Sequence, residues 1–167
     1  MNQIAIVVVA YNRPRSLKRL LSSLEEAVYD TEDITLIISI DHGDNAEVLA
    51  VAEQFVWKQG EKKVVYQETN LGLKAHILQC GTYTKEYGNL IMLEDDLYVS
   101  PVFFQYAKEA LAFAEDKEYI GGISLYNHLF HVHAREPFEA LPDGYDNWYM
   151  QFASSWGQAW SESQWTG

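Results

Sequence analysis

Three acidic side chains in a row follow a fully apolar segment in the second half of the chain. Leu90–Leu93 is Leu-Ile-Met-Leu, and Glu94, Asp95 and Asp96 come directly after it. Such a run is typical of a strand buried on both faces, as in a parallel sheet covered by helices. Acids at its end lie where open α/β sheets bind ligands. Adjacent carboxylates repel one another unless a cation offsets them, so the trio predicts Mg²⁺ or Mn²⁺ beside an anionic substrate.

The alternation of an extended chain predicts how the three acids are directed. Glu94 and Asp96 should face one way and Asp95 the other. An acidic stretch can instead cap the next helix or simply be solvated. Ser100-Pro101 already offers a capping hydroxyl and a proline suited to the first helical position, which favours the functional interpretation.

A second candidate lies after the first apolar segment, where Ala10, Tyr11 and Asn12 lead into Arg13-Pro-Arg15. A helix that begins at the proline would offer free N–H groups to a phosphate, and the arginines would add charge-assisted hydrogen bonds. The arginines are equally suited to a solvated surface. The loop gains weight only because the same edge of the sheet should carry the carboxylates.

Asp41 is a third candidate, since it ends another apolar segment. A strand-end acid can accept hydrogen bonds from a base or a ribose hydroxyl, although the same acid can be a plain turn residue. Further residues expected along this crevice are Asn70, Gly72, Lys74 and His76. Of these, Asn70 and Gly72 are also suited to shaping a turn.

Hydrophobic periodicity supplies the elements that must position these residues. It predicts strands at 4–10, 34–40, 63–66, 90–93 and 119–125. Helices should begin at Pro14, at Asp44 or Asn45, near Gly72 and at Ser100-Pro101. This alternation predicts an α/β fold, a mostly parallel sheet with helices on both faces. Core positions expected on the helices include Leu17, Leu20, Leu21, Leu24, Val28, Val48, Leu49, Ala52, Phe55, Val56, Leu73, Ile77, Cys80, Phe103, Phe104, Ala107, Leu111 and Ala114.

The pattern fades after residue 126, where four of the five tryptophans lie in Trp148–Trp165. Residues 156–165 suggest a helix that is not closed at Gly167, as expected of a piece of a longer protein. His131 and His133 would share one face of an extended segment near His128, but histidines in a polar loop are usually solvated rather than metal ligands. The aromatic residues could stack on sugars, though packing is their commoner role.

Composition limits the possible partners. The 167 residues fit one domain, and 48% apolar residues are enough for a core. A formal charge of −12 disfavours nonspecific binding to nucleic acid or anionic membranes. The single cysteine, Cys80, excludes an internal disulfide. With no signal peptide or membrane-length apolar run in the sequence, we expect a cytoplasmic protein; its oligomeric state is undetermined.

Two other enzyme classes fit less well. A sugar-phosphate nucleotidyltransferase would need a glycine-rich loop after the first strand, and residues 11–16 contain no glycine. A phosphatase with an aspartyl nucleophile would need an aspartate there, and Ala10-Tyr11-Asn12 has none. A non-catalytic nucleotide- or glycan-binding domain stays open.

Several segments together resemble the nucleotide-sugar glycosyltransferases of the GT-A fold, family 2 in particular. Residues 7–24 resemble the first strand and helix of that fold, 38–44 its second strand end and 70–80 a later helix. Residues 90–111 are similar to the region around the Glu-Asp-Asp form of the DxD motif in N-acetylglucosaminyltransferase I. The segment 152–165 is loosely similar to the acceptor side of that enzyme.

The resemblance implies roles for individual residues. Asp96 would ligate Mn²⁺ or Mg²⁺ at the donor's diphosphate, while Asp95 and Glu94 would contact the ribose and the donor sugar. Asp41 would meet the uracil, and Arg13 the nucleotide near its base or phosphates. The remaining residues of the expected donor site are Ala10, Tyr11, Asn12, Asn70, Gly72 and Lys74.

The resemblance also implies an activity. A hexosyl or N-acetylhexosaminyl group would pass from a UDP-sugar to a glycan or lipid-linked acceptor with inversion, in lipopolysaccharide or other polysaccharide synthesis. Residues 1–125 would bind the donor, and 126–167 would begin the acceptor side of the same domain. The catalytic base of the relatives would fall at or past Gly167, with Asp143 and Asp146 as stand-ins, so this stretch could bind donor without transferring sugar.

Overall fold

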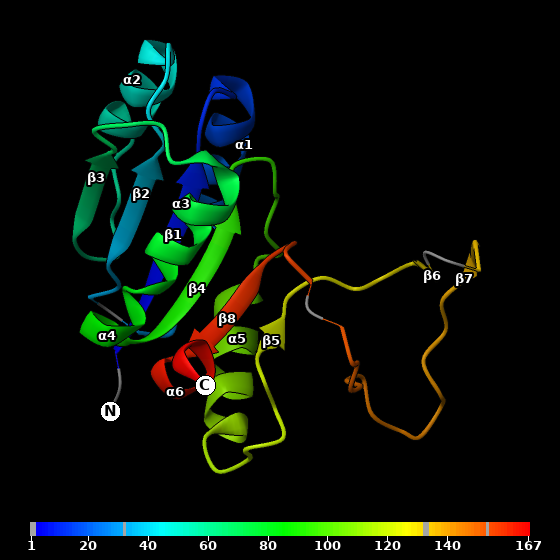
Figure 1. Ribbon diagram of the computed structural model, residues 1–167. Helices are drawn as coiled ribbons and strands as arrows, with labels where there is room; N and C mark the ends of the chain where they lie inside the picture. The colour runs from blue at the N-terminus through cyan, green and yellow to red at the C-terminus, as the bar shows by residue number, and fades with distance from the viewer. Residues whose placement is uncertain (1–2, 32, 132–133, 153) are drawn as a thin grey trace.

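A single six-stranded sheet forms the centre of the molecule. The computed structural model describes residues 3–31, 33–131, 134–152 and 154–167. The sheet order is β3-β2-β1-β4-β8-β5 (Figure 1). The first four of these strands are parallel, and β8 runs antiparallel to both β4 and β5. The bounds are β1 Gln3–Ala10, β2 Leu36–Ile40, β3 Lys62–Tyr66, β4 Gly88–Glu94, β5 Ile123–Ser124 and β8 Gln158–Ser161.

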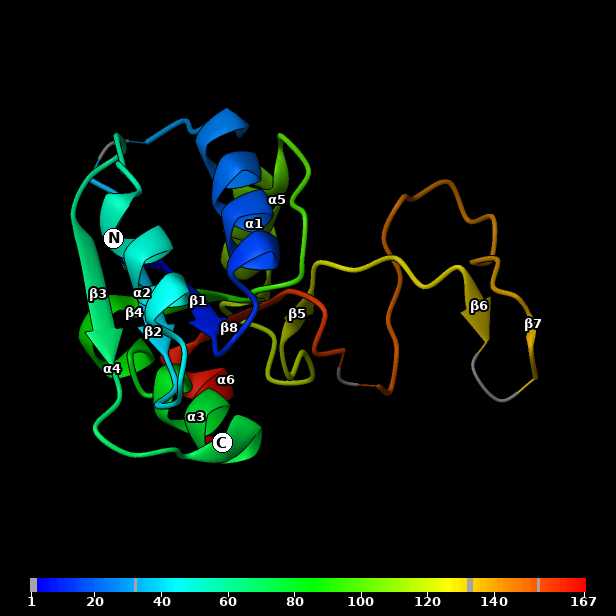
Figure 2. The same cartoon turned by 90° about the horizontal axis from the view of Figure 1, so that it is seen from above.

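Helices cover both faces of the sheet, which confirms the predicted α/β architecture (Figure 2). On one face lie α1 (Pro14–Glu26), α2 (Ala46–Gln54) and α5 (Phe103–Ala114). On the other lie α3 (Gly72–Gly81), α4 (Thr84–Tyr87) and α6 (Glu162–Thr166). Alternate residues of β1 enter the two cores, so Ile6 packs toward α1 and Val7 toward α3. Burial of each large apolar side chain contributes about 1.5–3 kcal/mol, which fixes the register of the strands.

Three residues expected in the core are exposed instead. Val28 is 62% exposed because α1 ends at Glu26 and Ala27 is extended. Val56 is 67% exposed because it follows the extended C-cap of α2. Leu73 is 63% exposed in the first turn of α3. Each lies at a helix end, where the 3.6-residue period no longer fixes the side-chain direction.

The predicted helix start at Ser100-Pro101 is wrong by two residues. Pro101 and Val102 form a turn, and α5 begins at Phe103 with Val102 as its N-cap. The expected core residues of this helix, Phe103, Phe104, Ala107, Leu111 and Ala114, are all buried. The helical face was therefore predicted correctly and its boundary was not.

The C-terminal elements differ most from expectation. The strand expected at 119–125 is limited to β5, and the helix expected at 156–165 is instead β8 followed by the short α6. The backbone of β8 pairs with β4 from Asn89 to Met92, so this segment fills the sheet between β4 and β5. Long-range pairing of this kind overrides local periodicity. Ala159 of β8 is fully buried as a result.

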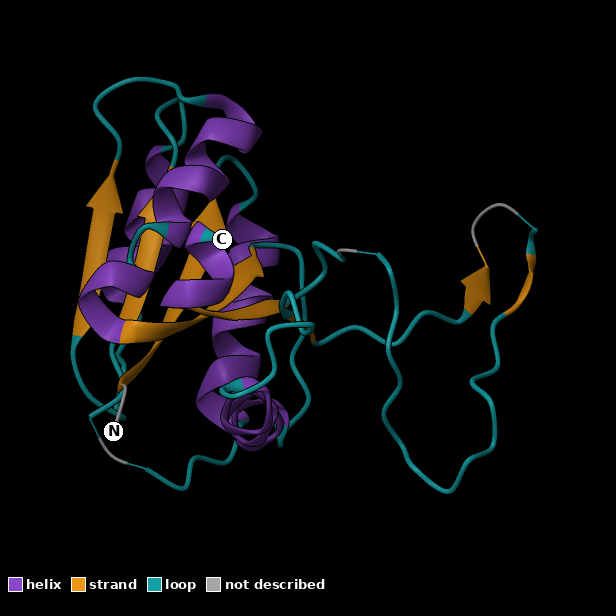
Figure 3. Cartoon of the chain, turned by 60° about the horizontal axis from the view of Figure 1, so that its bottom comes forward, coloured by secondary structure: helices purple, strands orange, loops and turns teal. Residues whose placement is uncertain are grey.

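Between β5 and β8 the chain leaves the sheet. The described residues of 126–157, here called the arm, extend away from the sheet and carry a small hairpin of β6 (Phe130–His131) and β7 (Glu136–Pro137) (Figures 1 and 3). Exposed large side chains on the arm include Leu129, Phe130, Leu141, Tyr145, Tyr149 and Phe152. Within the described residues, no helix has the length and apolar character needed to cross a bilayer.

Candidate functional site

The carboxyl ends of β1 and β4 are joined through Asp95. Its backbone N–H donates to the carbonyl oxygen of Val9 at 3.0 Å, continuing the β1–β4 pairing past the end of β4. Its side-chain Oδ2 accepts a hydrogen bond from the backbone N–H of Tyr11 at 3.3 Å. Asp95 is 1% exposed. Burial raises the pKa of this carboxyl group, and the charge of Arg13 offsets part of that increase.

Arg13 bridges two neighbouring carboxylates. Its Nη2 lies 2.7 Å from Asp95 Oδ1, and its Nη1 lies 2.6 Å from Asp96 Oδ2. Asp95 Oδ1 is buried yet accepts no well-aligned hydrogen bond from any described residue, so that contact is an ion pair alone. The Asp96 side chain is 45% exposed and Arg13 is 49% exposed. The pair is therefore open to solvent rather than sealed.

Glu94 and Asp96 act on each other electrostatically. Burial raises the pKa of Glu94, and the charge of Asp96 raises it further, more than the charge of the adjacent Asp95 does. The alternation expected of an extended chain is not kept past Glu94, because β4 ends there and Asp95 and Asp96 lie in a turn in which both contact Arg13. A cation placed between these two carboxylates would lower their mutual repulsion.

Asp41 holds the beginning of α3. Its Oδ1 accepts hydrogen bonds from the backbone N–H groups of His42 at 2.9 Å and Leu71 at 2.8 Å, and its Oδ2 accepts one from Gly72 at 2.9 Å. The side chain is buried, with 3% exposure. Gly72 has φ of 73°, a conformation that favours glycine. Gly72 thus has the turn-shaping role considered for it from the sequence, while Asp41, considered there as a turn residue at its own strand end, also holds the turn before α3.

Asn45 ties the end of β1 to the end of β2. Its side-chain amide donates to the carbonyl oxygens of Tyr11 and of Asp41, the latter at 2.9 Å. Its Oδ1 accepts from the Tyr66 hydroxyl at 2.9 Å. The sequence suggested Asn45 as a helix cap, but its side chain makes no capping bond to α2. This role was missed because it depends on contacts between separate strand ends.

Tyr11 is the exposed aromatic residue at this edge, with 42% exposure. Its ring lies over Gly43, where an added Cβ would come within 2.8 Å of the ring. Because its N–H reaches Asp95 and its carbonyl reaches Asn45, Tyr11 connects the carboxylates to the Asp41 turn. The structure therefore brings the ends of β1, β2 and β4 together, as the sequence predicted.

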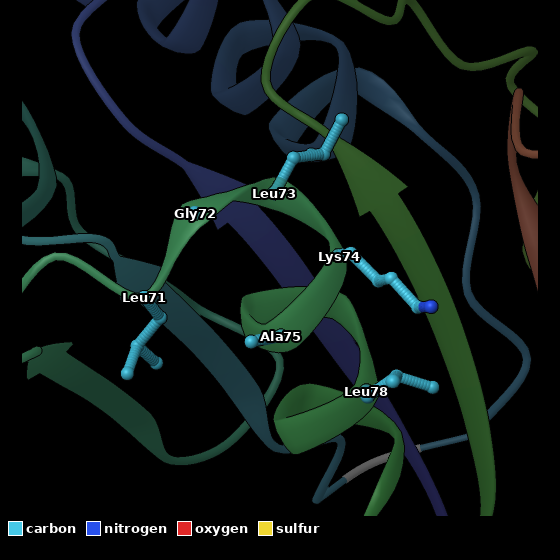
Figure 4. Close-up of a pocket in the computed structure, with 6 residues that line it drawn as sticks. All are labelled: Leu71, Gly72, Leu73, Lys74, Ala75 and Leu78. Atoms are coloured by element: carbon cyan, nitrogen blue, oxygen red, sulfur yellow. The ribbon is translucent and has the colours of Figure 1, made fainter.

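The other expected donor-site residues occupy varied positions. Ala10 is buried, and its carbonyl accepts the Asp41 N–H at 2.9 Å. Asn12 is exposed, and Asn70 donates to the His42 carbonyl at 2.8 Å. Lys74 is exposed in the first turn of α3, where its side chain points toward β4 (Figure 4). A shallow, mainly apolar hollow of about 390 Å³ lies at this turn, lined by Leu71, Gly72, Leu73, Lys74, Ala75 and Leu78.

His76 does not line the crevice, as the sequence suggested, but is buried with 2% exposure. Its Nε2 lies 2.7 Å from the hydroxyl of Ser39, which also accepts a hydrogen bond from Gln67 Nε2 at 3.1 Å. Burial lowers the pKa of His76, against the opposing charge of Asp41. This polar group beneath the Asp41 turn was not found from the sequence, although Ser39 in an apolar strand was a visible signal.

A second pocket, of about 310 Å³, lies beside the end of β4. Its lining includes Leu93 of β4 and the aromatic side chains of Tyr98, Phe103, Tyr106, Tyr126 and Trp156. The rings of Tyr126 and Trp156 meet edge to face, with centroids 4.6 Å apart. This pocket adjoins Glu94 in the chain and opens where the arm leaves the sheet.

The possible catalytic bases and histidine ligands lie on the arm. Asp143 is exposed and its Oδ1 accepts the Tyr145 N–H at 3.0 Å, while Asp146 is exposed as well. Figure 1 shows this part of the chain extending away from the sheet. His133 falls outside the described residues. Within the described part of the chain, no cluster of three or more acidic, histidine or cysteine side chains is arranged to hold a metal ion.

The carboxylates still fit an ion that is held jointly with a ligand. Mg²⁺ and Mn²⁺ are commonly bound by one or two carboxylates together with substrate phosphates and water. Asp96 offers an exposed hard oxygen, and the charge on nearby Glu94 would be offset by a cation. The residues present therefore suit a divalent ion, which a nucleotide that supplies the other ligands would hold more tightly.

The family model for glycosyl transferase family 2 matches residues 5–135, which include the strand ends and all three acids. This chain belongs to glycosyl transferase family 2. No curated protein matches its sequence detectably. The family 2 assignment rests on most of the chain, from β1 to the beginning of the arm.

Solved structures support the fold of this family 2 chain. The Staphylococcus aureus protein TarS, residues 1–349 in complex with UDP, superposes with a TM-score of 0.52 at 20% identity, over 68% of this chain and 32% of that one. Its complex with UDP-GlcNAc gives 0.51 at 19% identity, over 68% and 31%. The mannosyltransferase PcManGT from Pyrobaculum calidifontis, with GDP-Man and Mn²⁺, gives 0.56 at 17% identity, over 74% and 35%. The chain thus spans about a third of the length of these structures.

Proposed function

We propose that this chain forms the donor-binding part of a metal-dependent, inverting glycosyltransferase that acts on a UDP-sugar and a glycan or lipid-linked acceptor. The observation that carries the proposal is the meeting of Asp96, Glu94 and Arg13 at the joined ends of β1 and β4. A nucleoside diphosphate needs positive charge at its phosphates, and the site offers an arginine and a place for a divalent ion. The relatives that bind UDP, UDP-GlcNAc, or GDP-Man with Mn²⁺ support this choice of donor class.

Each residue then has a distinct task. Asp96 would hold the ion, which when bound stabilises the negative charge that develops on the leaving diphosphate. Arg13 would donate hydrogen bonds to the phosphates, as guanidinium groups do in a bidentate manner. Glu94 would face the donor sugar. Asp95 would contact the ribose once Arg13 has left its buried Oδ1.

The nucleobase would lie over the Asp41 turn beside Tyr11. Asp41 already accepts three backbone N–H groups, so a uracil N–H would have to share the unused capacity of Oδ2. The exposed face of Tyr11 offers a stacking surface, and Ala10, Asn12, Asn70, Gly72 and Lys74 surround the same turn or its approach. We therefore propose stacking, more than hydrogen bonding to Asp41, as the main support of the base.

The acceptor would enter from the side of the second pocket. Its aromatic lining suits the apolar faces of sugar rings, and it adjoins Glu94. An acceptor hydroxyl must lose its proton to a positioned base as it attacks the sugar. We propose that this base lies beyond Gly167. Asp143 and Asp146 would serve only if the arm folded back onto the sheet.

A binding experiment tests the donor proposal. Isothermal titration of UDP, GDP and UDP-GlcNAc, each with Mn²⁺ or with EDTA, would compare the unmodified chain with Asp96→Asn. We expect a uridine ligand to bind only with Mn²⁺ and the variant to lose at least about tenfold in affinity, the scale of a lost charge interaction of ~1.4 kcal/mol. Glu118→Gln, an exposed acid beyond α5, is the matched control and should bind normally.

Two results would contradict the proposal. Absence of binding by any nucleotide would refute the donor site, and equal binding in EDTA would refute the metal requirement. Glycan binding that needs neither nucleotide nor Mn²⁺ would instead support a non-catalytic glycan-binding domain.

A further inference from the structure

The guanidinium group of Arg13 contacts both Asp95 and Asp96, and this contact affects how a metal ion and a nucleotide can bind. This inference rests on the proposed function. We propose that Arg13 is a placeholder cation, whose guanidinium group pairs with the Asp96 carboxylate when no nucleotide is bound. When the donor binds, the guanidinium group moves to the diphosphate, and a divalent ion can then bind the carboxylate. Metal binding and nucleotide binding are then coupled through one side chain.

The first support is the position of the guanidinium group. Nη1 lies 2.6 Å from Asp96 Oδ2, and Nη2 lies 2.7 Å from Asp95 Oδ1, so one planar group joins two consecutive residues. An ion bound at Asp96 would stand close to this fixed positive charge. Like charges that share a carboxylate repel each other, so Arg13 in this position weakens metal binding.

The second support is that the Arg13 contacts can be released. The side chains of Arg13 and Asp96 are 49% and 45% exposed, and an exposed ion pair of this kind contributes only about 0–1 kcal/mol, whereas the carboxylate of Asp95 is buried. The contact with Asp95 Oδ1 lacks hydrogen-bond alignment, which leaves that oxygen incompletely satisfied. A diphosphate offers the guanidinium group aligned bidentate acceptors, so it competes well with both carboxylates.

The third support is that Arg19 can hold the loop when Arg13 moves. The Arg19 guanidinium donates to the backbone carbonyl of Asp96 and leaves the carboxylate alone. The loop after β4 also keeps its bond from the Asp95 N–H to Val9. The carboxylate of Asp96 therefore changes partner while its backbone stays in place.

This arrangement predicts that one substitution increases the affinity of the protein for Mn²⁺. Removal of Arg13 should tighten Mn²⁺ binding to the nucleotide-free protein, while it weakens UDP binding. The two binding equilibria are linked, so UDP raises the Mn²⁺ affinity of the unmodified chain in part by removing Arg13 from Asp96. In the Arg13 variant the UDP-dependent increase in Mn²⁺ affinity should therefore be smaller, by the factor by which Arg13 had lowered that affinity. A residue that only stabilised the loop would change neither quantity in this direction.

The test measures free Mn²⁺ by electron paramagnetic resonance during titration of the protein without nucleotide. We expect Arg13→Gln to bind Mn²⁺ about three- to tenfold more tightly than the unmodified chain, the scale of one released surface ion pair. Arg19→Gln removes the same charge near Asp96 without freeing its carboxylate, and should change the Mn²⁺ Kd less than about twofold by the same scale. Asp96→Asn gives the baseline for nonspecific binding.

Three results would overturn the proposal. One is an equal effect of Arg13→Gln and Arg19→Gln on Mn²⁺ binding, and another is weaker or unchanged Mn²⁺ binding in Arg13→Gln. The third is Mn²⁺ binding no stronger than the Asp96→Asn baseline. Arg13→Lys keeps the charge without the two-pronged fork and guards against a folding defect; its Mn²⁺ Kd should lie between the two extremes. Because this titration contains no nucleotide, its result tests the proposal even if UDP fails to bind. In that case the donor proposal falls and the competition at Asp96 stands.

Discussion

The carboxylate of Asp41 accepts the backbone N–H of Gly72 at 2.9 Å, which joins the end of β2 to the first turn of α3. Two more N–H groups, from His42 and Leu71, donate to the same side chain. An acid that could have been left free for a ligand is thus used to build the turn. Its substitution should therefore affect folding and ligand binding together.

Asp41→Asn should lower the free energy of unfolding by about 1–3 kcal/mol, because the amide presents an N–H to donors that need an acceptor. Urea denaturation measures the change. Asp44→Asn, at an exposed position three residues later, should alter stability by less than about 0.5 kcal/mol. Equal effects of the two variants would show that the Asp41 hydrogen bonds contribute little.

Glu94→Gln should stabilise the protein at neutral pH. Burial, and then the charge of Asp96, raises the pKa of Glu94 in the folded state, so its neutral form contributes stability below the unfolded pKa of about 4.3, and that contribution is lost as pH rises through the folded pKa. At pH 7 the ionised form is a cost that glutamine removes. We expect a Tm about 1–3 °C higher, as is usual for relief of a repelled charge in a chain of this size.

The pH dependence checks the cause of that stabilisation. The difference in Tm between Glu94→Gln and the unmodified chain should narrow as pH falls toward 4, where the glutamate becomes neutral like the glutamine. Scanning calorimetry at several pH values, with exposed Glu118→Gln as control, would measure it. A difference that stays constant with pH would indicate a packing effect instead.

His76 should make stability sensitive to mild acid. Burial lowers its pKa, so the neutral ring contributes stability above the unfolded pKa of about 6.5, and this contribution is lost as pH falls through the lower folded pKa. Urea denaturation between pH 7.5 and 5 should show a steeper decline in the unmodified chain than in His76→Gln. A slope in His76→Gln that equals the slope of the unmodified chain would exclude this role.

Gly43→Ala should weaken nucleotide binding with little loss of stability. The new Cβ would come within 2.8 Å of the Tyr11 ring, and this half-exposed ring can swing aside at small cost. If Tyr11 supports the base, UDP affinity should fall about three- to tenfold, since stacking on an aromatic residue contributes about 1–3 kcal/mol and is only partly lost. Gly121→Ala, with open space around its Cβ position, is the control. Unchanged UDP affinity in Gly43→Ala would count against the stacking surface.

The sequence predicted the parts of this molecule that depend on local pattern. The continuous burial of β1 follows from its unbroken apolar run and the buried face of α5 from helical periodicity, and the acids at and after the end of β4 lie at the sheet edge that parallel strands require. The use of Asp41 to cap a distant turn could not be predicted, because its partners Leu71 and Gly72 are 30 and 31 residues away. The burial of His76 depends in the same way on a partner in another strand, Ser39.

Strand β8 shows the same limit most clearly. Gln158–Ser161 contains no β-branched residue, and its neighbours suggested a helix. What makes it a strand is the open edge of β4 and the short β5 on its other side. The periodicity of a sequence does not reveal which strand edge is left unpaired in the folded sheet.

The position of β8 also sets the order in which the protein can be completed during synthesis. β4 ends at Glu94, but its outer neighbour is not translated until residues 158–161. Until then the growing chain exposes the backbone of an apolar strand, a template to which another nascent polypeptide could add. A ribosome that paused within the arm would prolong this exposure, so codon usage over residues 126–157 should influence how much of the protein is recovered without aggregation.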